Sequence, residues 1–390
     1  MKWRPHQLRD LCCQVVSGGT PSTSQSHFYG GPIPWLRTQE VTFNRIAETE
    51  MTITEDGLAN STAKWVPENS VIVAMYGNSA GRVATNLIPL TTNQACCNLI
   101  IDSSKADYRF IFYRLMLDYN VLHQMAKGAA QNNLNAGQIK AYTIQAPSVS
   151  EQGAIAEVVS AYDDLIENNR RRMKLLEEAA RQLYREWFVR LRFPGHERAK
   201  IKNGLPEGWE RQPLGDLADV TMGQSPESSY YNETGEGLPF HQGVADFGDR
   251  FVSHRVFTTA LNRLAEPSDI LCSVRAPVGR LNLTLDKIVI GRGLSAIRSR
   301  TNHQSLLFYQ LRNHFFKEDL IGAGSIFASV TKAEFLRQEI LVPPKHVADA
   351  FEDVSRPLDD QLRLQNEQNQ KLRSARDLLL PKLMSGELAV

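Results

Sequence analysis

The sequence predicts an α+β protein built from two tandemly duplicated domains, each followed by a long helix. Three observations carry this prediction. Two segments nearly two hundred residues apart share one order: a Gly-Ala loop, a short apolar strand ending in proline, and the start of a long helix. Apolar residues at helical spacing follow in both places, and short strand-like runs separated by turn residues precede both. We expect a first domain over 1–150, a helix over 151–192, a second domain over 193–345 and a C-terminal helix over 346–390.

The duplication is clearest at the end of each half, where one shift of 196 residues holds without a gap. The aligned pairs are Ile144 with Ile340, Pro147 with Pro343, Asp163 with Asp359, Leu176 with Leu372, and Leu183 with Leu379. Earlier in each half the shift drifts, as loops of different length require, but LRDL at 8 still pairs with LGDL at 214 and MYGNSAGRV at 75 with SVRAPVGRL at 273. A period of this size exceeds the roughly 20–50 residues of a solenoid repeat. It indicates a duplicated domain plus helix.

Each domain is expected to combine short strands with one helix. The first has strand candidates at 33–37, 71–75, 97–101 and 142–146, and a helix near 107–125. The second repeats this order, with strands at 238–242, 270–274, 287–290 and 338–342 and a helix near 303–320. Trp35, between Ile33 and Leu36, is expected in the core, and Gly18, Gly19 and Gly223 in tight turns.

The two long helices carry apolar stripes in steps of three and four, typical of a coiled-coil seam. The first stripe is Ile155, Val158, Tyr162, Leu165, Asn169, Arg172, Leu176, Ala179 and Leu183; the second is Phe351, Val354, Leu358, Gln361, Gln365, Gln368, Leu372, Ala375 and Leu379. We expect the helices to pair as an antiparallel coiled coil whose polar centres meet, with the domains at opposite ends. The alternative is that each helix packs back on its own domain.

Composition excludes several classes of function. The net charge is only +1, from 44 basic and 43 acidic residues, so a nucleic-acid surface would have to be local. No apolar run approaches the roughly 18 residues of a membrane span, and we expect a cytoplasmic protein. The five cysteines lack metal-ligand spacing and are expected to be reduced and mostly buried.

Motifs for catalysis are absent from the sequence. There is no GxxxxGK[ST] loop and no Gly-rich cofactor loop after a strand, so we expect no bound cofactor and no metal. An adenine methyltransferase would need an Asn or Asp before Pro-Pro and an aromatic residue after it. The only Pro-Pro here, Pro343-Pro344, stands between Val342 and Lys345. We expect a protein that is not itself an enzyme.

The sequence resembles that of the specificity subunit of type I restriction-modification systems. The matching stretches are GGTPS at 18–22, IPWLRTQEV at 33–41, QNNLN at 131–135, PSVSEQGAIAEVV at 147–159, REWFVRLRFPGHE at 185–197 and LLLPKLMSGEL at 378–388. They cover essentially the whole chain, and their order is more specific than any one of them. One departure is PPKHVADAFEDV at 343–354, which replaces the helix start of the first half.

The resemblance implies two target-recognition domains that each read half of an asymmetric, bipartite double-stranded DNA site, with the helices setting the gap. It also implies partners: two modification subunits that methylate adenine and dock on the helices, and motor-endonuclease subunits. The residues expected to form the helix seam or to dock partners are Tyr162, Leu165, Asn169, Leu176, Leu183, Leu358, Gln365, Leu372 and Leu379.

Polar side chains on loops are the candidates for DNA contact, because they can hydrogen-bond base edges and phosphates. They are Arg37, Gln39, Asn78, Arg82, Gln131, Asn132 and Asn133 in the first domain, and His241, Gln242, Arg275, Arg280 and Ser325 in the second. Arg82 aligns with Arg280, which favours a phosphate or structural role for both. Arg275 aligns with Gly77, so the side chain at this position differs between the two domains, as expected of a residue that reads bases. The alternative for each is an ordinary solvated loop residue.

Three other functions stay open on the sequence alone. The chain could be a nuclease or methyltransferase acting alone, although it lacks their motifs. It could be a duplicated module for a non-DNA ligand, which the near-neutral charge allows. It could also be an orphan DNA-binding subunit without active partners.

Overall fold

The computed structural model describes residues 3–127, 133–315 and 330–390. The chain forms two compact units. Unit 1 comprises Met1–Asn168 and Gln368–Val390, and unit 2 comprises Asn169–Glu367. Each unit therefore contains a segment of both long helices. No helix in the described part of the chain is long and apolar enough to cross a membrane.

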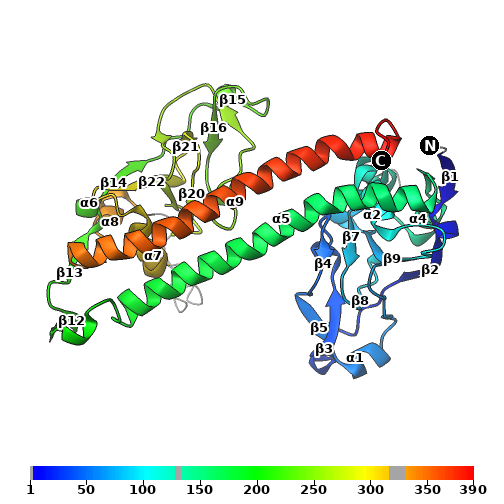
Figure 1. Ribbon diagram of the computed structural model, residues 1–390, viewed down its shortest axis with the longest axis horizontal. Coiled ribbons are helices and arrows are strands. Elements are labelled where there is room, and N and C mark those ends of the chain that lie inside the picture. The colour runs from blue at the N-terminus through cyan, green and yellow to red at the C-terminus, as the bar shows by residue number, and fades with distance from the viewer. Residues whose placement is uncertain (1–2, 128–132, 316–329) are drawn as a thin grey trace. The chain divides into compact units, whose positions relative to one another are not determined.

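Unit 1 contains a five-stranded sheet, a three-stranded sheet and a strand pair that precedes the first long helix (Figure 1). The strand orders are β2-β9-β6-β7-β4, β5-β3-β8 and β1-β10. The strands are β1 Arg4–Gln7, β2 Cys12–Ser17, β3 Tyr29–Leu36, β4 Arg45–Ile46, β5 Met51–Ile53, β6 Val71–Ala74, β7 Val83–Asn86, β8 Thr91–Thr92, β9 Cys96–Ile101 and β10 Thr143–Ala146. The short helices are η1 Leu8–Leu11, η2 Ser26–Phe28, η3 Thr38–Glu40, η4 Gly77–Ser79, α1 Glu55–Ala59, α2 Tyr108–Leu117, α3 Tyr119–Lys127 and α4 Ala136–Ala141.

Unit 2 repeats this arrangement with strand orders β14-β22-β19-β20, β15-β17-β16-β21-β18, β13-β23 and β11-β12. The strands are β11 Ile201–Lys202, β12 Leu205–Pro206, β13 Glu210–Pro213, β14 Ala218–Met222, β15 Tyr231–Asn232, β16 Leu238–His241, β17 Phe257–Thr258, β18 Leu264–Ala265, β19 Ile270–Ser273, β20 Leu281–Leu283, β21 Ile288–Ile290, β22 Leu294–Ser299 and β23 Glu339–Val342. The short helices are η5 Arg185–Val189, η6 His196–Arg198, η7 Ser228–Tyr230, η8 Val244–Asp246, α6 Leu214–Leu217, α7 Gln304–Phe315 and α8 Lys332–Leu336.

Strand pairing shows that the two units share one topology. The order β2-β9-β6-β7 recurs as β14-β22-β19-β20, and the first strand of each unit pairs with the last, β1 with β10 and β13 with β23. The central strand of the second sheet has one antiparallel and one parallel neighbour in both units: β3 lies between β5 and β8, and β16 between β17 and β21. The predicted duplication is thus a duplication of fold.

Most predicted elements form, with one difference. The eight strand candidates overlap β3, β6, β9, β10, β16, β19, β21 and β23. The single helix predicted near 107–125 is instead two helices, α2 and α3, which meet at Asp118, whose carboxylate accepts hydrogen bonds from the Arg114 guanidinium. The helix predicted to 320 is described as far as Phe315. Trp35 is buried as predicted, as are all the cysteines except Cys13, and all five thiols are free.

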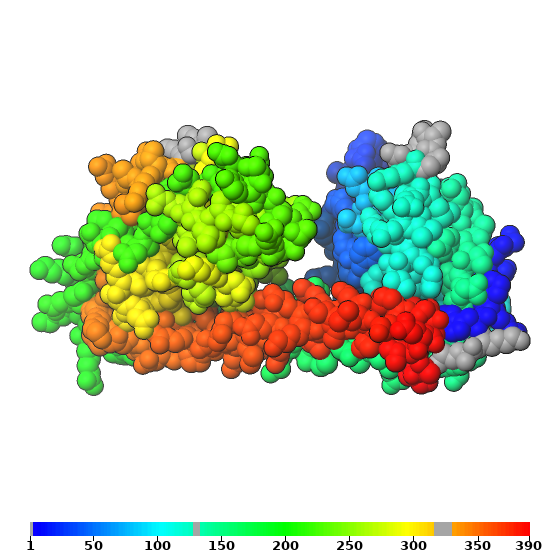
Figure 2. All heavy atoms as spheres, turned by 90° about the horizontal axis from the view of Figure 1, so that it is seen from above, coloured from blue at the N-terminus to red at the C-terminus, as the bar shows by residue number. Residues whose placement is uncertain are grey.

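The long helices are α5, Val149–Tyr184, and α9, Lys345–Ser385. In unit 1 the last turns of α9 pack into the core, where Leu380, Leu383 and Met384 contact a cluster that includes Leu8 and Val159. Figure 2 shows the C-terminal turns against the N-terminal segment of the chain. In unit 2 the core takes Ala180 and Tyr184 from α5 and Phe351 and Leu362 from α9. Each core is therefore completed by both helices.

The stripe of buried and half-buried residues on each helix differs from the prediction at every second position and at the last one. On α5 it runs through Ile155, Val159, Tyr162, Ile166, Asn169, Met173, Leu176, Ala180 and Tyr184, and on α9 through Phe351, Ser355, Leu358, Leu362, Gln365, Asn369, Leu372, Arg376 and Leu380. The prediction of Leu165 in the seam is wrong, because its side chain is 52% exposed whereas Ile166 is 4% exposed. Adjacent apolar residues, such as Leu165 and Ile166, allowed the sequence stripe to be placed on either of two neighbouring positions.

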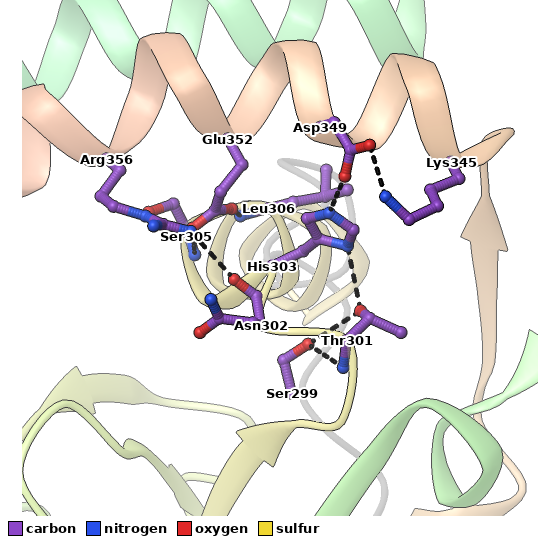
Figure 3. A network of polar contacts seen from close by, with 10 residues as sticks. All are labelled: Ser299, Thr301, Asn302, His303, Ser305, Leu306, Lys345, Asp349, Glu352 and Arg356. Atoms are coloured by element: carbon purple, nitrogen blue, oxygen red, sulfur yellow. Dashed lines mark hydrogen bonds and ion pairs between the residues drawn. The ribbon is translucent and has the colours of Figure 1, made fainter.

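Helix α7 is fixed to α9 by a polar network within unit 2 (Figure 3). The buried carboxylate of Glu352 accepts hydrogen bonds from the backbone amides of Ser305 (3.3 Å) and Leu306 (3.1 Å). These amides lie in the first turn of α7, where backbone donors have no acceptor within the helix. His303 Nε2 lies 2.8 Å from a carboxylate oxygen of Asp349. A negative charge is favourable at a helix N-terminus, so Glu352 both caps α7 and sets its position on α9.

Candidate nucleic-acid interface

The ends of several strands in unit 1 are tied together by backbone hydrogen bonds. The amide of Asn93, in the β8–β9 turn, donates to the carbonyl of Leu36 at the end of β3 (3.0 Å). The amide of Met75, just after β6, donates to Ala95 in the same turn (2.8 Å), and Leu134 donates to Met75 (2.8 Å). Four loops are thereby held side by side at one edge of the unit.

Unit 2 has the same three hydrogen bonds at the corresponding places. Gly291 donates to the carbonyl of His241 (2.8 Å), Val274 donates to Gly293 (2.9 Å), and Val330 donates to Val274 (3.0 Å). These bonds align the two units residue by residue, independently of loop length. Leu36 corresponds to His241, and Met75 corresponds to Val274.

Three exposed or half-buried positions follow from this alignment, and each holds a different side chain in the two units. Arg37 corresponds to Gln242, Tyr76 to Arg275, and Gln94 to Arg292. We call the set Thr20, Arg37, Tyr76 and Gln94 the loop edge of unit 1. The set Ser225, Gln242, Arg275 and Arg292 is the loop edge of unit 2.

Thr20 and Ser225 occupy equivalent places in a repeated Gly-x-Thr/Ser-Pro turn. The glycines that begin the turns, Gly18 and Gly223, donate to the carbonyls of Cys96 (3.3 Å) and Leu294 (2.9 Å), the first residues of β9 and β22. Both glycines are required by close approach, since an added Cβ would lie 2.2 Å from the Thr92 oxygen or 2.1 Å from the Gly291 oxygen.

The hydroxyl that follows each of these glycines holds a side chain of the loop edge. Thr20 Oγ1 donates to Oε1, the side-chain amide oxygen, of Gln94. Ser225 Oγ donates to Gln242 Oε1 (2.8 Å) and accepts from the backbone amide of Arg292 (3.2 Å). Each hydroxyl thus orders exposed polar groups before any ligand binds.

The charges of the loop-edge arginines differ in how they are compensated. Arg37 forms ion pairs with Glu40 and Glu50, so its charge is largely neutralised. Arg275 and Arg292 are exposed, and neither forms an ion pair within the described part of the chain. The loop edge of unit 2 therefore presents more uncompensated positive charge.

The other predicted contact residues lie on or behind the loop edges. Gln39 is exposed beside Arg37, Asn78 is exposed in η4, and Asn133 forms an isolated β-bridge with Tyr76. Arg82 and Arg280 are equivalent, because their carbonyls accept from Ala74 and Ser273 at 2.9 Å. Gln131, Asn132 and Ser325 lie outside the described residues.

Two expectations for unit 2 need correction. His241 is fully buried, with its Nε2 3.0 Å from Nδ1 of His254, so it cannot contact DNA in this structure. It takes the strand position that Leu36 has in unit 1, and burial, followed by the charge of His254, lowers its pKa to about 4. Arg275 corresponds to Tyr76 and not to Gly77, because the backbone bonds shift the alignment by one residue.

Gln94 and Arg292 are interface candidates that the sequence analysis missed. Both stand at the tip of a tight turn between two strands, in NQA at 93–95 and GRG at 291–293. A single exposed polar residue between two strand signals was the available clue, but many surface turns look the same.

Comparison with known proteins assigns the family. The family model "Type I restriction modification DNA specificity domain" matches residues 1–178 and 206–374. The chain belongs to this family. The two matched ranges each include one loop edge, so the specificity domain occurs twice here.

Some relatives of this specificity-domain protein match it over its whole length. It is 28% identical to the putative type I restriction enzyme MjaX specificity subunit of Methanocaldococcus jannaschii, over all of this chain and 94% of the relative. It is 27% identical to the MjaIX specificity subunit of the same organism, with the same coverage. The crystal structure of a type I restriction-modification S subunit from M. genitalium has the same fold, with a TM-score of 0.63, 17% identity, and coverage of 98% of this chain and 96% of that one.

Proposed function

We propose that this chain is the DNA-reading specificity subunit of a type I restriction-modification complex, in which it is not itself catalytic. Each unit reads one half of an asymmetric, bipartite double-stranded site. The observation that carries the proposal is the pair of loop edges: one backbone frame, built twice, holds different polar side chains in the two units. Two readers of this kind suit a site whose halves differ.

The long helices act in this proposal as an antiparallel coiled coil that sets the gap between half-sites. Contacts inside each unit support it. In unit 1, Arg376 of α9 pairs with Asp163 of α5 (2.6 Å), and Asn369 Nδ2 donates to the Ile166 carbonyl (3.4 Å). In unit 2, Arg250 pairs with Glu177 of α5 and with Asp359 of α9.

Buried polar groups give the helix pair a defined register. Asn169, Gln365 and Asn369 are at most 8% exposed, and they lie among apolar neighbours in the stripes. Such groups cost stability, but a single buried amide can fix the register and orientation of paired helices. A fixed register keeps the gap constant.

The outer faces of the helices are the proposed docking surface for two modification subunits. They carry apolar side chains that are more than half exposed: Leu165 and Leu378 in unit 1, and Leu175 and Leu364 in unit 2. Exposed apolar side chains on an otherwise charged helix suit a protein partner. The docked subunits would methylate adenine, and motor-endonuclease subunits would join to cut unmodified DNA.

A map of methylated adenines in the source genome, with and without this gene, tests the proposal. We expect one split motif that disappears on deletion. Replacing residues 1–150 with the corresponding domain of another family member should change one half-site and leave the other. An unchanged map, together with DNA binding by the purified chain that does not weaken steeply with salt, would contradict the proposal, because phosphate contacts make affinity salt-dependent.

A further inference from the structure

The loop edges point to the residues that distinguish the two half-sites. We propose that Gln94 and Arg292, and likewise Tyr76 and Arg275, are equivalent base-reading positions, and that the two arginines make the half-site of unit 2 contain guanine. This inference rests on the proposed function, since it concerns the same DNA. It assigns a role to Gln94 and Arg292 from the geometry of their turns and the chemistry of their side chains.

The first step of the argument compares positions that the backbone makes equivalent. A residue that only supports the frame should keep its chemistry in both units, as Arg82 and Arg280 do. A residue that reads bases should change when the half-sites differ. Gln94 and Arg292 change from a neutral amide to a cation, although the hydrogen bonds of Asn93 and Gly291 hold their turns in the same way.

The second step concerns what these side chains can recognise. In the major groove an arginine donates two hydrogen bonds to O6 and N7 of guanine, whereas glutamine pairs in the same manner with adenine. Arg275 and Arg292 are exposed and have no carboxylate partner in the described part of the chain, so no internal ion pair must be broken before they bind. Arg37, by contrast, is already paired with Glu40 and Glu50.

The third step is that hydroxyls anchor groups of the loop edges: the side chain of Gln94 in unit 1, and the side chain of Gln242 with the backbone of Arg292 in unit 2. Ser225 holds the carbonyl oxygen of Gln242 (2.8 Å) and thereby leaves its amide nitrogen to donate outward. The same hydroxyl accepts from the backbone of Arg292 (3.2 Å), so Gln242 and Arg292 are anchored at one point. In unit 1 the equivalent Thr20 holds the carbonyl oxygen of Gln94. An ordered side chain loses less entropy when it binds a base.

The test uses the complete complex and compares methylated motifs. The variants are Arg292→Gln, Arg275→Gln and Gln94→Arg, and the control is Arg211→Gln, an exposed arginine on β13. We expect each arginine variant to relax or change one base position in one and the same half-site, with the other half-site and the gap unchanged. Gln94→Arg should alter the opposite half-site, and the control should leave the motif intact.

If a variant complex no longer methylates DNA, DNA binding by the purified variant chain is measured instead. The purified chain is titrated with duplexes that carry single base-pair changes, and Arg292→Gln should lose discrimination at one guanine by about 5- to 150-fold, the range of a bidentate base contact. Unchanged discrimination at every position, or equal loss in both half-sites, would overturn the inference. If the wild-type complex has no bipartite motif, the proposed function itself fails.

Discussion

Tyr113 donates a hydrogen bond of 2.7 Å to the carboxylate of Asp163, and the same pair recurs 196 residues later, where Tyr309 donates to Asp359 (3.2 Å). In each unit this bond joins the helix that covers the sheet, α2 or α7, to one of the long helices. An arginine completes both sites: Arg376 pairs with Asp163, and Arg250 with Asp359. The duplicated bond thus fixes each sheet-covering helix to a long helix.

Replacing Tyr113 with Phe should lower the free energy of unfolding by about 1–2 kcal/mol, because a buried bond to a charged acceptor is lost while Arg376 still compensates Asp163. Urea denaturation measures the change. Tyr230→Phe, at a hydroxyl-bearing ring that is 49% exposed, is the control and should have almost no effect. Equal effects of the two substitutions would contradict a specific role for the Tyr113–Asp163 bond.

Arg250 is a buried charge of unit 2, with its side chain 3% exposed between Glu177, Asp359 and the ring of Phe308. Arg250→Met should cost about 3 kcal/mol, because Asp359 loses its ion-pair partner and Glu177 keeps, among the described residues, only Arg312. Arg300→Met, which breaks an exposed ion pair with Asp219, should cost less than about 1 kcal/mol. Chemical denaturation of the two variants compares them, and a similar loss in both would show that burial of Arg250 does not matter.

His241 should make stability depend on pH. Its folded pKa is lowered from 6.5 to about 4, first by burial and then by His254, so the unfolded chain binds a proton at a higher pH than the folded chain does. The contribution of neutral His241 is complete above about pH 6.5 and is lost as the pH falls toward 4. His241→Leu, which copies Leu36, should flatten the stability profile between these values. Exposed His346→Gln is the control, and an unchanged slope in His241→Leu would refute the assignment.

Gly223→Ala should disrupt the loop edge of unit 2. Its new Cβ would lie 2.1 Å from the Gly291 carbonyl oxygen, so the turn that carries Ser225 must move. Methylation should lose specificity in one half-site only. Gly243→Ala places a Cβ in open space one residue after Gln242 and should keep the motif. If Gly223→Ala methylates the wild-type motif, the turn does not position the reading side chains.

Inserting four residues in register into one long helix should lengthen the gap between half-sites. Four residues add about 6 Å of helix, and DNA rises about 3.4 Å per base pair, so the gap should grow by one or two base pairs. Methylome sequencing reads the gap directly. A four-residue insertion in the exposed loop at 233–236 is the control and should leave the gap unchanged. Binding that persists with an unaltered gap in the helix variant would count against the spacer role.

Much of the fold could be predicted because the same pattern of strands and helices occurs twice in the sequence. Strands such as β6 and β19 are apolar runs bounded by turn residues, and Ile144 and Ile340 align without a gap. The phase of the helix stripes could not be derived in this way. Leu165 and Ile166 are neighbours and both are apolar, so only packing against the rest of unit 1 decides which is buried.

The candidate interface was only partly predictable. Arg37, Gln242 and Arg275 follow strands, and for that reason they were predicted to contact DNA. The structure places them on the loop edges, and their contact with DNA stays a prediction. His241 looked like a polar loop residue, but the strand extends through it and buries it with His254. Gln94 and Arg292 needed the backbone bonds of both units, since no sequence pattern distinguishes these turn tips from other turns.

The first and last described turns of the chain meet in unit 1, where a Cβ on Gly386 would lie 2.5 Å from the indole nitrogen of Trp3. Unit 1 thus takes residues from both Met1–Asn168 and Gln368–Val390. During synthesis its core can be completed only after the whole of unit 2 has been made.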